Sequence, residues 1–197
     1  QRLFDEHALI VSVQDGWLES TEVLLMGVPG PMRARVSFGA GLRFSLGRCH
    51  RLHLFCDEKG AARFRIAGQP VEYLDGTVTP PDGSASAWLA FVDRHWSRSD
   101  GAVLARRTSR PFTDLTHAAR ERIGKLYNAI DAVPLTESLD LLGLAADHIR
   151  ARSANVEDEI RRELLAATQR TLQERLTNIR WHDAQQLWPR LVAFWRH

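Results

Sequence analysis

The chain has 197 residues, of which 44% are hydrophobic and 25% charged, and its net charge at pH 7 is only +2. This is the composition of an ordinary globular protein with a buried core, and it argues against binding nucleic acid over a broad basic face. No apolar run approaches the ~20 residues that cross a bilayer and no signal peptide is evident, so we expect a cytoplasmic protein without a membrane partner.

The first half of the chain, residues 1–100, alternates apolar and polar residues with a period of two. The runs RARVSFG, LRFSL, RLHLF and ARFRIAG place apolar side chains on one face of successive short strands. ALIVSV, WLESTEVLL and AWLAFVD supply further strand candidates, and turn-forming sequences such as GVPGP and DEKG separate the runs. Because no helical crossover joins them, we predict an antiparallel β-barrel or sandwich over 1–100.

The stretch GRCHRLHLFCD, residues 47–57, holds both cysteines and has the residue types of a metal site. On a strand, Cys49 and His53 share a face but lie about 13 Å apart at ~3.3 Å per residue. Two ligands of one zinc ion must lie within about 4 Å of each other. The alternation in RLHLF favours a strand, so we expect no metal site here and no disulfide between Cys49 and Cys56.

The polar, basic residues 101–112 predict a linker, and beyond it residues 113–197 have a helical pattern. RPFTDLTHAARERIGKLYNAI has apolar residues three and four apart, with Asp114 or Thr113 as the expected cap. Pro134 ends that pattern, and Thr136 can cap a second helix. The fold class predicted for the whole chain is therefore α+β, with an N-terminal antiparallel β-barrel or sandwich and a C-terminal helical bundle.

The clearest helical pattern covers residues 156–179, where acidic residues at the start suit the positive end of the helix dipole. Its apolar stripe, with charges of both signs on the flanks, suits a neighbouring helix. We expect a homo-oligomer formed through this helix, and a bundle within one chain is the alternative.

The tail WHDAQQLWPRLVAFWRH is rich in tryptophan and contains Pro189. Its aromatic residues fall near one helix face, which favours packing in the core, with binding of a protein partner as the second interpretation. Across this helical half, the predicted partner-binding residues are Leu164, Leu165, Leu172, Leu176, Trp188 and Trp195.

Catalytic motifs are missing from the sequence. There is no G-x-S-x-G and no phosphate-binding glycine loop, and Cys49 and His50 point to opposite faces of a strand. We therefore expect no catalytic residues and no cofactor.

The run ARRTSRPF forms a compact set of donors that suits a phosphate. The predicted ligand-binding residues are Arg106, Arg107, Ser109 and Arg110. An R-R-x-x-R run beside a small barrel resembles the arginine motif of PilZ-type domains, which bind cyclic di-GMP, and the strand series up to AWLAFVD looks like the later strands of such a barrel. In that family the arginines precede the barrel and a D-x-S-x-x-G signature follows, whereas DGSASA here has Ala87 in place of the glycine. This departure implies weak or absent dinucleotide binding and a role through protein contacts.

These observations predict a non-catalytic regulatory or interaction module whose helical half self-associates. The alternative is a PilZ-like receptor for a phosphate-containing small ligand, bound by the arginine run. An enzyme and a nucleic-acid binder are less favoured. The ligand, the partner and the pathway are not encoded in any motif of the sequence.

If the arginine run binds phosphate, cyclic di-GMP or another nucleotide at millimolar concentration should raise the melting temperature. The double variant Arg106→Ala/Arg110→Ala should abolish that rise, because each charge-assisted contact contributes roughly 1.5–3 kcal/mol. A thermal-shift screen checks this, and the absence of any nucleotide effect would contradict it.

Overall fold

The computed structural model describes residues 9–12, 16–40, 52–55, 72–73, 86–137, 140–141, 143 and 156–195. The chain divides into two compact units, the first made of 1–85 and 99–112 and the second of 86–98 and 113–197. It therefore passes from one unit to the other at three points. One of these points falls at 112/113. The predicted boundary at 100/101 is not among them, because residues 86–98 join the helical unit and the predicted linker 101–112 joins the first.

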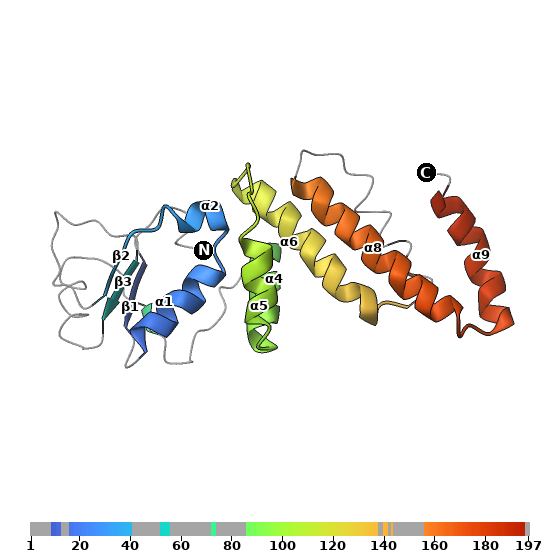
Figure 1. Ribbon diagram of the computed structural model, residues 1–197, viewed down its shortest axis with the longest axis horizontal. Coiled ribbons are helices and arrows are strands. Elements are labelled where there is room, and N and C mark those ends of the chain that lie inside the picture. The colour runs from blue at the N-terminus through green and yellow to red at the C-terminus, as the bar shows by residue number, and fades with distance from the viewer. Residues whose placement is uncertain are drawn as a thin grey trace. The chain divides into compact units, whose positions relative to one another are not determined.

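The first unit contains a parallel sheet of short strands in the order β2-β3-β1-β4 (Figure 1). The strands are β1 (Leu9–Ser12), β2 (Phe38–Ala40), β3 (Leu52–Phe55) and β4 (Glu72–Tyr73). Leu52 of β3 aligns with Leu9 of β1 on one side and with Phe38 of β2 on the other. The buried side chains of Val11, Leu52 and Leu54 form the apolar centre of the described sheet.

Three described helices accompany this sheet in the first unit. They are α1 (Trp17–Met26), α2 (Gly30–Arg33) and α5 (Gly101–Thr108). Gly16, at the start of α1, has a left-handed backbone with φ 68°, which glycine adopts without steric cost. α1 and α2 lie between β1 and β2 in the sequence, and a connection of this kind is what two parallel strands of one sheet require.

The antiparallel β-barrel or sandwich predicted for 1–100 is wrong. WLESTEVLL forms α1, AWLAFVD forms the start of α4 (Ala87–Ser97), and the described strands pair in parallel. The buried residues of α4 are Trp88, Phe91, Val92 and His95, a spacing of three and four that marks a helix once the window extends past AWLAFVD. LRFSL and ARFRIAG lie outside the described residues.

In the second unit most of the described residues of 113–197 are helical, as predicted. Besides α4, the unit contains α6 (His117–Ala132), the 3-10 turn η1 (Val133–Leu135), α8 (Val156–Leu176) and α9 (Trp181–Trp195). The cap of α6 is Thr116, whose hydroxyl accepts from the Ala119 amide at 3.3 Å, rather than Asp114 or Thr113. The helix predicted after Thr136 falls mostly outside the described residues. None of the helices in the described part is long and apolar enough to span a bilayer.

An aromatic core joins α4 to α6. Phe91 stacks on Tyr127 with ring centroids 4.7 Å apart, and Trp88 meets Phe91 edge-on at 5.6 Å. At the far end of α4 the buried His95 lies with its Nε2 3.0 Å from a carboxylate oxygen of Asp131. The two helices are therefore joined by apolar packing with one buried polar pair at its edge.

The start of α4 lies directly against α6 at Gly124. A Cβ atom at this position would lie 2.5 Å from the carbonyl carbon of Ala87, so no larger residue fits without movement of the backbone. On either side, Asn128 donates to the Ala87 carbonyl at 2.8 Å, and Glu121 accepts from the Ala87 amide at 2.8 Å and from the Ser86 hydroxyl. Glycine permits this close approach, and the flanking polar side chains satisfy the backbone groups at the helix start.

The environment of Glu121 makes this contact sensitive to acid. Partial burial alone would raise the pKa of Glu121, but the hydrogen bonds from Ser86 and from the Ala87 amide outweigh it and hold the pKa below its ordinary value. The stabilisation from Glu121 is therefore present above the ordinary pKa of a glutamate. It is lost as the pH falls through the lowered value.

Gly124→Ala should lower the free energy of unfolding by about 1–3 kcal/mol, because the added methyl group forces α4 away from α6. Gly143→Ala is the matched control, since a Cβ there meets no atom within 4 Å and alanine is the better helix former. Denaturant unfolding of both variants checks this, and equal stability of the two would contradict the close contact.

Candidate interaction surface

The cysteine and histidine stretch contributes no described site. His53 lies in β3, so residues 52–55 form a strand as predicted, while Cys49, His50 and Cys56 lie outside the described residues. Within the described ranges, no group of three or more His, Cys, Asp or Glu residues is placed to hold a metal ion.

The arginine run lies on α5 and just beyond its end, and its members differ in exposure. Arg106 and Ser109 are exposed and Arg110 is half-buried, whereas Arg107 is only 6% exposed. Neighbouring positions on a helix do not face each other, so Arg106 and Arg107 do not form one outward set of donors. Phosphate binding by the four predicted residues stays a prediction.

Sequence reasoning missed Arg33, which the fold brings to the same place. Its guanidinium donates to the Thr108 hydroxyl at 2.9 Å and to the Val28 carbonyl at 3.1 Å, and burial lowers the pKa of Arg33. A Cβ on Gly30 would lie 3.2 Å from the Cα of Ser109, so α2 packs closely on the end of α5. Part of the arginine run therefore serves the joint between these helices. No local signal reveals a contact between residues 75 positions apart.

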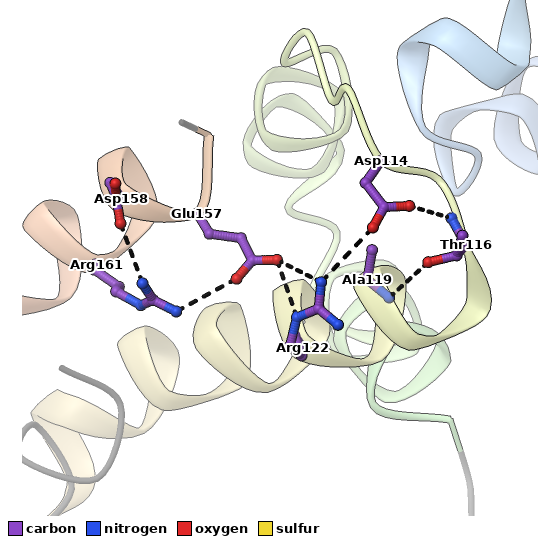
Figure 2. A network of polar contacts seen from close by, with 7 residues as sticks. All are labelled: Asp114, Thr116, Ala119, Arg122, Glu157, Asp158 and Arg161. Carbon is purple, nitrogen blue, oxygen red and sulfur yellow. Dashed lines mark hydrogen bonds and ion pairs between the residues drawn. The ribbon is translucent and has the colours of Figure 1, made fainter. Parts of the chain in front are cut away.

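A network of charged side chains joins the starts of α6 and α8 (Figure 2). Glu157, only 7% exposed, accepts from Arg122 Nε at 3.1 Å and from Arg161 Nη2 at 3.3 Å. Arg161 also donates to Asp158 at 3.1 Å, and Arg122 lies 3.8 Å from Asp114. The carboxylates at the start of α8, predicted to suit the helix dipole, thus also pair with arginines across and along the helices.

Asp114, at the exposed end of the network, is also hydrogen-bonded to the backbone just before α6. The amide of Thr116 donates to Asp114 at 2.9 Å, and this hydrogen bond, helped by Arg122, holds the pKa of Asp114 below its ordinary value. Every charged side chain drawn in Figure 2 has an opposite charge beside it. The network, in which three carboxylates surround two guanidinium groups, therefore fixes α8 on α6.

Glu157→Gln should lower the free energy of unfolding by about 1.5–3 kcal/mol, because it removes a buried negative charge and replaces one of the two oxygens that accept from Arg122 and Arg161 with an amide donor. Asp158→Asn, at a half-exposed partner of Arg161, should cost less than about 1 kcal/mol. Unfolding in urea at low ionic strength compares the two. Equal losses of unfolding free energy in the two variants would contradict a larger contribution from the buried Glu157.

A hollow of about 360 Å³ lies between η1 and α8. Arg175 closes one end by donating to the carbonyls of Pro134, at 3.1 Å, and Thr136. The lining contains Arg170 and Glu174 as well as Arg175, so charges of both signs surround the hollow.

The predicted partner-binding stripe of α8 is largely internal. Leu164 and Leu172 are buried, Leu165 is half-buried and Leu176 is exposed, and α8 packs on α6 within the same unit. Two of the predicted residues therefore belong to the bundle within one chain, which was the alternative. Self-association through 156–179 stays a prediction, and Leu165 and Leu176 are the side chains still available for it.

The most exposed large apolar side chains of the helical unit include two tryptophans of α9. Trp181 is 77% exposed and Trp188 is 68% exposed, although their pattern favoured burial in the core. They lie seven residues apart and so share one face. Trp195 continues the spacing at the end of α9, but its side chain is outside the described set. Trp181 was absent from the predicted site, although the seven-residue repeat was visible in the sequence.

Comparison with known proteins adds no relative, since no family model, curated protein or solved structure matches the chain. The candidate site is therefore defined by geometry alone. It is the face of α9 that carries the two exposed tryptophans, called here the tryptophan face, and it is made of Trp181, Ala184, Gln185, Trp188, Leu191 and Val192.

Proposed function

We propose that the protein is a non-catalytic interaction module whose helical unit binds an amphipathic helix of a protein partner through the tryptophan face. The observation that carries the proposal is the exposure of Trp181 and Trp188 on one side of one helix. Large aromatic side chains left in water in this way are typical of interaction surfaces, where tryptophan is among the residues that contribute most to binding.

The spacing of the face favours a helical partner. If Trp181 and Trp188 are taken as the first position of a heptad, Ala184 and Leu191 fall at the fourth. Apolar residues at these two positions form the seam along which two helices pack. A helix is therefore the partner whose rows of side chains can pack along the whole length of the tryptophan face.

The charge of α9 disfavours the other classes of partner. The tryptophan face contains no ionisable residue, and between Trp181 and Trp195 the only Asp, Glu, Lys or Arg residues are Asp183 and Arg190. Nucleic-acid sites present several Lys or Arg residues to phosphates, and helices that lie on membranes carry a strongly basic polar face. α9 has neither feature.

The composition of α9 also explains why a partner would stabilise it. Pro189 lies inside the helix, where proline removes a hydrogen bond and costs about 3 kcal/mol. Among residues 181–193, Leu187 is the one fully buried side chain. A 15-residue helix with an internal proline is marginal on its own, so burying its second apolar face against another helix supplies packing that it lacks.

A photo-reactive benzophenone amino acid at position 185 should form a protein cross-link in cells that make the protein. The same group at position 186 is the matched control, because Gln185 and Gln186 are neighbouring exposed glutamines and only the first lies on the tryptophan face. The substitutions Trp181→Gln/Trp188→Gln should abolish the product at 185.

Gel analysis of the irradiated cells reads the result. No product at position 185, or equal products at 185 and 186, would refute the proposed function. Cross-linking to nucleic acid or recovery with membranes, in place of a protein product, would refute it as well.

A further inference from the structure

We infer that the partner helix is α9 of a second copy of this chain, so that two tryptophan faces pack against each other. The inference rests on the proposed function and names the partner for the same surface. It follows from the charge of the face, from its shape and from the area it offers.

The charge of the face permits self-pairing. In a dimer with two-fold symmetry the same patch lies on both sides of the contact. A charged group in the patch would therefore lie near the same charged group of the other copy. The tryptophan face has no ionisable residue to be repelled in this way. The chain as a whole carries a net charge of only +2, so long-range repulsion between two copies is weak.

The shape of the face provides both halves of a knob-into-hole contact. In paired helices a knob inserts among four residues of the facing helix, and Trp181, Ala184, Gln185 and Trp188 are spaced to form such a hole. Ala184 is small and lies between the two tryptophans along the seam, which leaves room for a large side chain. The tryptophans are the large knobs, so the face is complementary to a copy of itself.

The area of the face predicts a weak contact. A tryptophan side chain buries about 150–250 Å², so four exposed tryptophans from two copies would contribute roughly 700 Å². The tryptophans alone therefore fall short of the ~1,200 Å² of stable interfaces. We therefore expect a reversible dimer that forms in the micromolar range and dissociates on dilution.

Sedimentation velocity and light scattering across about 1–500 μM test this, a range that brackets the affinities of small interfaces. The mass should rise from the monomer value of 22.3 kDa towards twice that value. Trp181→Gln/Trp188→Gln should weaken the dimer at least ~10-fold, since two such losses exceed 1.4 kcal/mol. Trp96→Gln is the matched control, because it removes an exposed tryptophan of α4 that is not on the face, and it should leave the dimer unchanged.

A second variant tests the hole separately from the knobs. Ala184→Phe keeps both tryptophans but fills the space between them, so it should also weaken the dimer, with circular dichroism confirming that the helices remain. A dimer unaffected by the double tryptophan variant or by Ala184→Phe would overturn the inference.

The two proposals fail in different ways. Suppose that the protein is a monomer at every concentration but position 185 gives a face-specific cross-link to a protein of another mass. This result would overturn the dimer inference and would still support the proposed interaction module. A monomer with no cross-link at 185 would overturn both. A cross-linked product at twice the chain mass, lost in Ala184→Phe, supports both.

Discussion

Gly124 has no side chain, and the first turn of α4 occupies the space that a side chain would fill. On either side of this contact, Glu121 and Asn128 hydrogen-bond to the start of α4, and further along α6 Asp131 holds His95. These four positions of α6 recur every three or four residues, so they lie along one face of the helix, beside the Tyr127 ring that stacks on Phe91. The close approach of the two backbones is the condition on which the packing of their aromatic side chains depends.

The other elements of the second unit depend on the same helix. Arg122 projects from α6 toward Glu157 at the start of α8, so α6 holds α4 through one set of side chains and α8 through another. Within the described ranges, α9 keeps a single fully buried side chain over 181–193, Leu187. Among the described helices of the unit, α4, α6 and α8 therefore supply most of the buried side chains, and α9 is the one whose apolar surface is least buried.

Local patterns predicted the parts of the fold that local interactions decide. The helices at α6, α8 and α9 follow from apolar spacing, because each side chain meets neighbours three or four positions away. α4 was mistaken for a strand because a seven-residue window, AWLAFVD, ends before His95 completes the helical spacing. The cap of α6 was misplaced by two or three residues, since Thr113, Asp114 and Thr116 are all suitable cap residues.

Contacts between distant residues could not be predicted in this way. The parallel pairing of Leu52 with Leu9 and Phe38, and the hydrogen bond from Arg33 to Thr108, leave no periodic trace in the sequence. The tryptophan repeat was visible, but whether those rings are buried depends on how many helices cover them. That number is decided by tertiary packing, which a single sequence does not reveal.

The path of the chain between its two units has a consequence for synthesis on the ribosome. Residues 86–98 belong to the second unit, whereas the next residues, 99–112, return to the first. The packing surface for Trp88 and Phe91 is therefore translated only after α5 is complete, and Asp131, the partner of His95, follows that histidine by 36 residues. For that interval the nascent chain displays the apolar side of α4 without its cover, a state in which chaperones bind and unfinished chains aggregate. A fold with its units interleaved in this order completes the first unit at residue 112, while residues 86–98 of the second unit still wait for the helices that cover them.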